Sequence, residues 1–163
     1  MERGRGYIEK DWGRSFPSAW VWMQSNHFGT TGISLTASVA SIPMARWRFR
    51  GFIVGLWHGG RLHRFTTYNG GKIERLVIDD RQVHWVLRNR THRLEIRAPR
   101  VDATDLKGPS TSDMGVRVPE SLSAAIEVRL CALAESRQSI LFEGTGRHAG
   151  LEVAGDLRLL AGK

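Results

Sequence analysis

The chain has a single cysteine, Cys131, among its 163 residues, so it cannot form an internal disulfide bond. Such sparse cysteine is typical of a reducing compartment. No apolar run approaches the roughly 20 residues that a membrane-spanning helix needs. The polar N-terminus, MERGRG, is followed by no apolar signal region. We therefore expect a cytoplasmic protein, with peripheral contact at a membrane left open.

Tracts of five or more basic residues are also absent, although the net charge is +8. Arg46, Arg48 and Arg50 alternate with Trp47 and Phe49. In a strand this spacing places the arginines on one face and the aromatic rings on the other, which is typical of a solvated sheet face. A basic surface can still attract phosphates or an anionic membrane in a salt-dependent way. We do not expect nucleic acid as the partner.

Short apolar runs separated by turn signals fill most of the chain. Asn69-Gly70 is a dipeptide that tolerates positive φ and predicts a tight antiparallel hairpin. Strands at this spacing are typical of an antiparallel barrel or sandwich, so we expect one all-β domain over residues 1–163. The prolines at 99, 109 and 119 predict a long loop over about 99–120. The expected strands are 5–10, 20–26, 31–41, 46–57, 61–68, 72–78, 82–88, 91–98, 122–133, 138–143 and 150–160.

Residues 122–133 fit two structures. Leu122, Ile126 and Leu130 repeat at helical spacing, whereas Ile126, Val128 and Leu130 alternate as in a strand. Periodicity alone leaves both open.

A glycine pair near the C-terminus resembles a dinucleotide-binding fingerprint. Gly144 and Gly146 follow an apolar run, but the fingerprint also needs a helix after the glycines and an acid about 20 residues further on. The residues that follow look like strand, so we interpret the glycines as a hairpin turn.

Histidines and serines give no catalytic or metal-binding pattern. His58, His63, His84 and His92 lie on expected strands or at their ends, with no spacing typical of a ligand set. Antiparallel strands could bring His63 and His84 together, but surface or capping roles are favoured. No Gly-x-Ser-x-Gly elbow supports a hydrolase. We expect no metal.

Residues 6–28 are the most informative stretch, because they combine large aromatic rings with charged and amide side chains. Trp12, Trp20 and Trp22 fall within them, together with Glu9 and Asp11. Apolar walls with a few fixed polar groups are typical of a small-molecule pocket. An aromatic-rich strand pair in a β core is the competing interpretation.

The spacing within this stretch resembles the C-terminal half of tocopherol cyclases. The resemblance continues at lower density through a β run over 32–41, an aromatic-Asn-Gly turn at 68–70, a strand around Trp85 and a Pro-Ser-Thr segment at 109–111. The residues that carry the opening motif are Gly6, Tyr7, Glu9, Lys10, Trp12, Gly13, Phe16, Pro17, Trp20, Trp22, Gln24, Asn26 and Phe28.

This resemblance implies an antiparallel lipocalin-like barrel, or half of a two-barrel protein, with a strand at 122–133. It also implies the reaction, in which a prenylated benzoquinol closes its phenol oxygen onto a side-chain alkene to give a chromanol ring. It implies no cofactor. Since the family's N-terminal half is missing, a homodimer mate or a separately encoded half are the implied protein partners.

Ring closure needs an acid that protonates the alkene. Glu9 lies within the motif and is the first candidate, and Asp11, two positions on, is the second. A carboxyl group stays protonated near neutral pH when it is buried or beside another carboxylate. The simpler interpretation of Glu9 is a surface ion pair with Lys10.

The remaining motif residues are the candidates for substrate binding. Trp20 and Trp22 share a strand face and would shield and stabilise a carbocation through their ring faces. Gln24 and Asn26 continue that face and could hydrogen-bond the quinol hydroxyls. The implied lining also includes Tyr7 and Trp12.

Two other functions stay open. A non-catalytic lipocalin-like barrel would bind a hydrophobic isoprenoid or quinone without converting it. A basic interaction module would bind nucleic acid or an anionic surface in a salt-dependent way.

Overall fold

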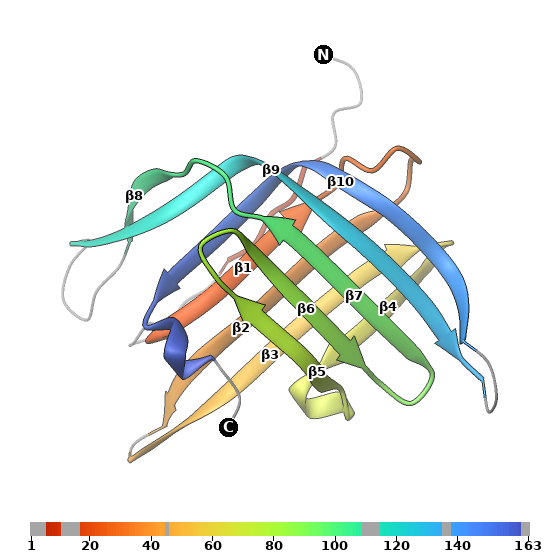
Figure 1. Ribbon diagram of the computed structural model, residues 1–163, viewed down its shortest axis with the longest axis horizontal. Helices are drawn as coiled ribbons and strands as arrows, with labels where there is room; N and C mark the ends of the chain where they lie inside the picture. The colour runs from red at the N-terminus through yellow and green to blue at the C-terminus, as the bar shows by residue number, and fades with distance from the viewer. Residues whose placement is uncertain (1–5, 11–16, 45, 109–114, 135–137, 161–163) are drawn as a thin grey trace.

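The computed structural model describes residues 6–10, 17–44, 46–108, 115–134 and 138–160. Its described residues form one antiparallel sheet of ten strands, ordered β4-β3-β2-β1-β10-β9-β7-β6-β5, with β8 paired to β9 (Figure 1). The strands are β1 (Ala19–Ser25), β2 (Ser34–Met44), β3 (Trp47–His58), β4 (Arg61–Thr66), β5 (Lys72–Ile78), β6 (Gln82–Arg88), β7 (His92–Pro99), β8 (Thr104–Gly108), β9 (Val116–Leu133) and β10 (Gln138–Gly155). Two 3₁₀ turns, η1 (Thr67–Asn69) and η2 (Leu157–Leu159), complete the description.

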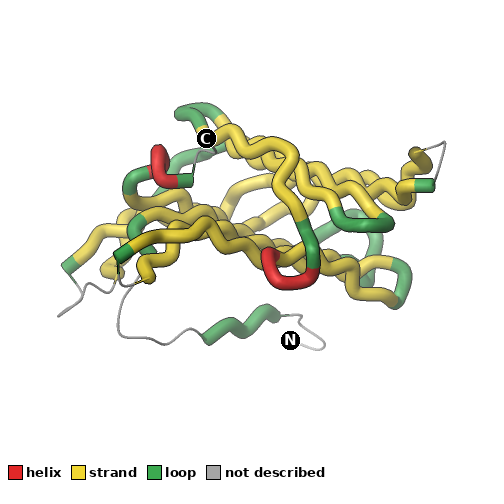
Figure 2. The backbone as a smooth tube through the Cα atoms, turned by 90° about the horizontal axis from the view of Figure 1, so that it is seen from below, coloured by secondary structure: helices red, strands yellow, loops and turns green. Residues whose placement is uncertain are grey.

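The sheet curls back over itself into two layers (Figure 2). One layer runs from β4 to β1 and the other from β5 to β7, and the long strands β9 and β10 connect them (Figure 1). Register shifts in β10 near Phe142 and Ala149 mark irregularities of the kind that let a strand bend. The sheet order ends at β4 and β5, and no pairing between these two strands occurs in the described chain, so the curl is not closed into a barrel.

The alternating patterns of the sequence produce the layers. In β1 every second side chain, from Ala19 to Ser25, is buried between the layers, and the intervening side chains are only partly buried. β2 alternates in the same way. The core between the layers is filled by large side chains, and the Trp85 ring meets Phe52 of the opposite layer edge-on at a centroid distance of 6.3 Å. The interior is therefore a packed core.

The expected all-β antiparallel class is confirmed, and several strand boundaries need correction. Residues 6–10 do not form a strand. The expected loop over 99–120 contains β8 and the start of β9. Residues 122–133 are strand, which settles the periodicity that fitted both structures.

The hairpin expected at Gly144–Gly146 is also wrong, because both glycines lie inside the continuous strand β10. A Cβ on Gly146 would come within 2.8 Å of the Phe28 ring and of the Ser25 hydroxyl. This glycine therefore permits close packing inside a strand, and the local sequence does not distinguish that role from a turn.

Candidate functional site

The outer side of the β1–β4 layer carries the motif residues. Trp20, Trp22 and Gln24 project from the face of β1 that points away from the core. Residues 6–10 run along that side of the layer (Figure 2). We call this cluster of motif residues and their contacts the outer-face site.

Glu9 is the centre of the outer-face site. The Trp22 indole Nε1 donates a hydrogen bond to Glu9 Oε2 at 3.0 Å, and the Tyr7 hydroxyl donates to the same oxygen. Tyr7 also contacts the Thr36 hydroxyl of β2 at 3.0 Å, and its ring lies 6.3 Å from the Trp22 ring. The segment before β1 is thus held against the sheet by its own motif residues. Glu9 itself is exposed.

A second carboxylate completes the aromatic part of the site. Trp20 Nε1 donates to Glu152 Oε2 at 2.7 Å, and Glu152 stands opposite Trp22 in the pairing of β1 with β10. Glu152 was not among the candidates from the sequence. Only strand register reveals it, because it lies 132 residues from Trp20 along the chain.

The amide pair forms the other end of the site. Gln24 Nε2 donates to Asn26 Oδ1 at 2.8 Å, and the Ser34 hydroxyl donates to the same oxygen at 2.5 Å. Gln24 follows Trp22 on the outer face of β1, and Asn26, just beyond the strand, contacts Gln24. Asp11 and Trp12, the other two candidates, lie outside the described residues.

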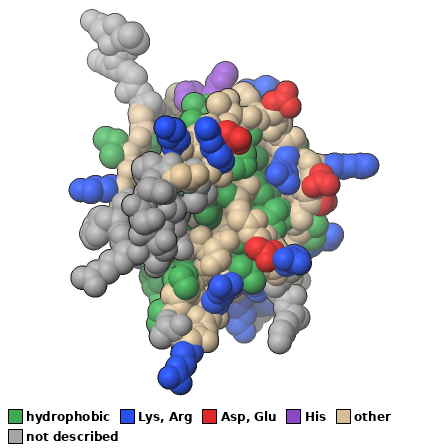
Figure 3. Space-filling model, turned by 90° about the vertical axis from the view of Figure 1, so that its left-hand side faces the viewer, with side chains coloured by type: hydrophobic (Ala, Val, Ile, Leu, Met, Phe, Trp, Pro, Cys, Tyr) green, Lys and Arg blue, Asp and Glu red, His purple; other side chains and the backbone are tan. Residues whose placement is uncertain are grey.

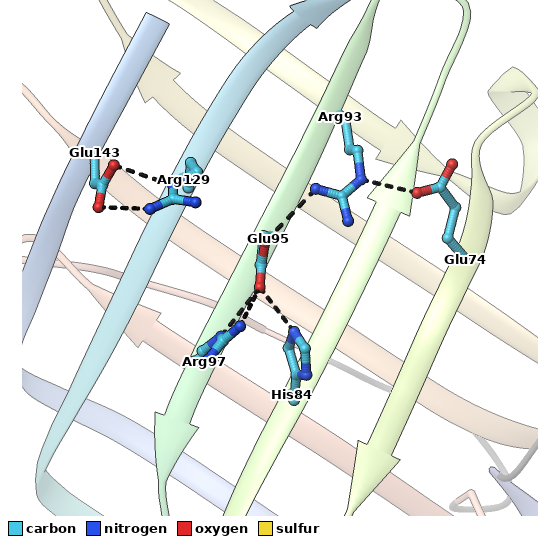
Figure 4. Close-up of polar contacts among 7 residues, drawn as sticks. All are labelled: Glu74, His84, Arg93, Glu95, Arg97, Arg129 and Glu143. Atoms are coloured by element: carbon cyan, nitrogen blue, oxygen red, sulfur yellow. Dashed lines mark hydrogen bonds and ion pairs between the residues drawn. The ribbon is translucent and has the colours of Figure 1, made fainter. Parts of the chain in front are cut away.

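The charged residues form a separate network on the outer face of the second layer (Figure 4). Glu95 is its centre, since it accepts from His84 at 2.9 Å and from Arg97 at 2.8 Å and lies 3.5 Å from Arg93. The hydrogen bond from Arg97, with help from His84, lowers the pKa of Glu95. A shallow cleft of about 350 Å³ lies beside it. Its lining is Glu95, Arg97, Glu127, Val128, Arg129, Glu143, Gly144 and Thr145.

Mutual pairing gives this cleft a structural role. Arg129 and Glu143 make two hydrogen bonds of 3.0 Å, which lower the pKa of Glu143 and raise that of Arg129. Acids and bases that satisfy one another in this way keep the network charged and fixed. The lining of this cleft is mostly charged and lacks the large aromatic side chains of the outer-face site. Figure 3 shows another side of the molecule, where Lys and Arg are scattered among apolar and acidic side chains.

Three histidines meet at one end of the core. His63 is buried, its ring lies 4.8 Å from that of His92 and 6.3 Å from that of His58, and His58 packs on Phe142 at 4.8 Å. Burial lowers the pKa values of His63 and His92.

The histidine pairing considered from the sequence, His63 with His84, differs from the one in the structure. His63 meets His92 instead of His84, which pairs with Glu95. The surface role expected for His63 is therefore wrong. Within the described ranges, no group of three His, Cys, Asp or Glu side chains is placed to hold a metal ion.

Together the fold and the outer-face site define an all-β protein that displays a tryptophan–carboxylate cluster on an open sheet face. Residues 1–155 match the family model described as "Tocopherol cyclase-like". The chain belongs to the tocopherol cyclase-like family.

Named relatives agree with this family. The chain is 28% identical over 167 residues to the "Probable tocopherol cyclase, chloroplastic" of Oryza sativa subsp. japonica, with 95% of this chain and 34% of the rice protein covered. It is 28% identical over 170 residues to the "Tocopherol cyclase, chloroplastic" of Zea mays, with the same coverages. The chain thus spans about a third of the length of these relatives.

Among solved structures, kievitone hydratase from Nectria haematococca is similar over 85% of this chain and 40% of its own, at 16% identity and a TM-score of 0.37. No helix in the described part of the chain has the length and hydropathy to cross a membrane.

Proposed function

We propose that this chain contributes the acid and the cation-stabilising wall for an intramolecular cyclisation of a prenylated benzoquinol. The observation that carries the proposal is the carboxylate of Glu9 held against the Trp22 indole and the Tyr7 hydroxyl. The family to which the chain belongs supports the same chemistry. A hydrophobic small molecule of the prenylquinol type is therefore the proposed ligand.

The reaction begins with proton transfer. The Glu9 carboxyl group donates its proton to the less substituted alkene carbon, a C–H bond forms, and the positive charge develops on the tertiary carbon. The phenol oxygen then bonds to that carbon, and the phenol proton returns to the carboxylate. No atom is gained or lost, so the product is an isomer of the substrate and the step needs no cofactor.

The tryptophans stabilise the cation. An indole face placed over a positive charge contributes roughly 0.5–2 kcal/mol, depending on how far water is excluded. Trp20 and Trp22 both project from the outer face of β1, and their nitrogens are fixed by Glu152 and Glu9. Fixed rings keep their faces in place while the charge moves. Gln24, the next outward residue of β1 after Trp22, and its partner Asn26 offer hydrogen-bonding groups for the quinol hydroxyls.

Exclusion of water is the remaining requirement. Glu9 is exposed, and a general acid of this kind works at neutral pH when its surroundings keep it protonated. We infer that the bound substrate and a further polypeptide layer cover the outer-face site during turnover. The relatives are about three times as long as this chain, which supports a further layer. A homodimer mate or a separately encoded half would supply it here.

The non-catalytic carrier is the weaker alternative. A lipocalin-like carrier would hold its ligand between the layers, where Trp85, Phe65 and Met23 are fully buried in a packed core. The cytoplasmic location stays a prediction. The names of the rice and maize relatives add the chloroplast as the other candidate, and cell fractionation would separate the two.

Incubation of the chain with a prenylated benzoquinol in deuterated water tests the reaction. We expect a chromanol that carries one deuterium at the former alkene carbon. Glu9→Gln should reduce its rate at least about 100-fold while quinol binding, measured by tryptophan quenching, persists. Glu127→Gln, at an exposed carboxylate of β9, is the matched control and should be unaffected. Full activity in Glu9→Gln, or a chromanol without deuterium at the former alkene carbon, would contradict the proposal.

A further inference from the structure

Two exposed histidine rings meet where β1 ends beside β10. His27 lies just beyond β1, and His148 lies within β10. Their ring centroids are 5.5 Å apart and the ring planes meet at 79°. Both residues are exposed. We call His27 and His148 the histidine pair, which is distinct from the three histidines at the end of the core.

A bulge in β10 produces this contact. The register with β9 shifts between Gly146 and Ala149. Within the described chain, His148 is the residue other than glycine that has a positive φ, at 47°. A left-handed backbone is unfavourable for a residue with a Cβ, and bulges re-aim side chains. β10 is therefore locally strained where the His148 ring turns toward His27.

Ser25 holds the two backbones of the histidine pair together. Its buried hydroxyl donates to the Arg147 carbonyl oxygen at 2.8 Å and accepts from the His27 N–H at 3.1 Å. The Arg147 N–H donates to the His27 carbonyl oxygen at 2.9 Å. Gly146 permits this close approach, because a Cβ there would come within 2.8 Å of the Ser25 hydroxyl oxygen. The two imidazoles are thus presented by a backbone held through three hydrogen bonds.

The histidine pair stands on the same side of the sheet as the outer-face site. The Cβ position of Gly146 points toward the buried ring of Phe28 in the core. The next residue, Arg147, therefore points outward, and so does His27, which is bridged to Arg147. The ring of His148 lies on this outer side as well, since it contacts the His27 ring.

The Trp22 indole leads from Glu9 toward the histidine pair. Its Nε1 donates to Glu9, whereas Cζ3, on the opposite edge of the indole, lies over the backbone of Gly150. His148 is two residues before Gly150 in β10, which is a rise of about 6–7 Å in an extended strand. A flat ligand ring that rests on the Trp22 face with one end at Glu9 therefore extends its other end toward the pair.

We propose that His27 and His148 bind the quinol hydroxyl that does not cyclise. This assignment rests on the proposed function, in which the alkene and the cyclising oxygen lie near Glu9. The second hydroxyl of a benzoquinol stands at the opposite end of the ring. A neutral imidazole has one donor and one acceptor nitrogen, so one ring can accept from this hydroxyl while the other donates to its oxygen. The pair then selects a ring with two hydroxyls over a phenol with one.

Other interpretations fit the histidine pair less well. A metal ion is a common ligand of paired imidazoles, but no group of three His, Cys, Asp or Glu side chains in the described ranges is placed to hold one. An edge-to-face contact that only stabilises the bulge is the structural alternative. That role predicts no preference between ligands that differ in one hydroxyl, so ligand preference separates it from the proposal.

Calorimetric titration of the full chain in the absence of oxygen tests the assignment. The ligands are a singly prenylated benzoquinol and the prenylated phenol that lacks only the far hydroxyl. We expect the wild type to bind the quinol roughly tenfold more tightly, as hydrogen bonds to one hydroxyl allow. In His27→Phe/His148→Gly this preference should vanish while the phenol binds as before. Glycine is chosen at position 148 because it adopts positive φ without strain.

His58→Phe is the matched control, since it replaces a ring of the separate cluster at the end of the core and should keep the preference. Circular dichroism verifies that each variant is folded. Three results would overturn the assignment: an unchanged preference in the double variant, an equal loss of affinity for both ligands, or no binding of the quinol by the wild type. Full activity in Glu9→Gln would contradict the proposed acid and leave this binding assignment standing, so the two failures are distinguishable.

Discussion

The ring of Trp22 lies against the backbone of Gly150, where a Cβ atom would come within 2.7 Å of ring atom Cζ3. Gly150 pairs with Gln24, the next outward residue of β1, so the ring leans across from one strand to its neighbour. The direction of the Trp22 indole therefore depends on a hydrogen atom at position 150. This contact couples β10 to the carboxylate of Glu9, which accepts from the same indole.

Gly150→Ala should displace the Trp22 ring while preserving the fold. A contact under 3.0 Å forces the ring to move, and the hydrogen bond from Nε1 to Glu9 should be lost with it. We expect a changed near-ultraviolet circular dichroism spectrum and weaker quenching by quinol, with an unchanged far-ultraviolet spectrum. Gly29→Ala is the control, because a Cβ there meets no atom within 4 Å. Identical spectra in the two variants would contradict this coupling.

Glu95→Ala should destabilise the protein. The carboxylate is only 15% exposed and pairs with His84, Arg93 and Arg97. Its removal leaves His84 and Arg97 without this acceptor, whereas Arg93 keeps its hydrogen bond to Glu74. We expect a loss of about 1–3 kcal/mol in the free energy of unfolding, measured by urea titration at pH 7.

Glu143→Ala provides the comparison, since its pair with Arg129 is about half exposed. Exposed pairs contribute little, so the urea midpoint should stay near that of the wild type. An equal effect of the two substitutions would show that burial does not determine the strength of this network.

The histidine cluster should make stability depend on pH. The pKa values of folded His63 and His92 lie below the ordinary 6.5, because burial disfavours the charged rings and His63 also faces His92, Arg61 and His58. The unfolded chain then takes up protons first as the pH falls. The free energy of unfolding should be greatest above about pH 6.5 and decline as the pH falls through that value toward the lower pKa values of the folded rings.

His63→Phe keeps a ring at this position and removes one titrating group, so the decline in the urea midpoint between pH 7.5 and pH 5.5 should be smaller. His27→Phe, at an exposed position, should decline as the wild type does. Glu95 is expected to act in a separate range, because its pKa is lowered from 4.5 and its contribution is lost only at more acidic pH. If the urea midpoint of His63→Phe falls as much as that of the wild type, His63 does not contribute to the pH dependence of stability.

Trp85→Phe should lower the free energy of unfolding by less than the lost side-chain volume suggests. The indole Nε1 is buried without a hydrogen-bond partner among the described residues, and an unsatisfied buried donor costs about 1–3 kcal/mol. Phenylalanine removes that donor and keeps an aromatic contact with Phe52. We expect a smaller loss than for Leu87→Ala in the same strand, for which about 2–5 kcal/mol is typical. A larger loss would show that the indole nitrogen is satisfied.

The strands that could be predicted from the sequence are those whose pattern is local. The expected 72–78 and 82–88 coincide with β5 and β6, because alternation and flanking turn residues mark both ends. The continuity of β10 could not be predicted, since Gly146 owes its place to contacts with Phe28 and Ser25, which are distant in the sequence.

The candidate site divides in the same way. The shared face of Trp20 and Trp22 follows from a spacing of two residues, and the association of Glu9 with that face agrees with the motif. Glu152 was missed because its position depends on which strand lies beside β1 and in which register. The pairing of His63 with His92 depends on how the two layers face each other. Strand partners and layer contacts are long-range properties that a local pattern does not encode.

The open curl of the sheet has a consequence for self-association. β4 and β5 end the sheet order, and an end strand presents backbone groups to which a strand of another molecule can add. β4 is only six residues long and carries Arg61 and Arg64. β5 begins at Lys72, and its register shifts between Ile73 and Arg75. Short, charged and irregular edges are poor templates for the addition of such a strand, so we expect the unclosed sheet to resist edge-to-edge association.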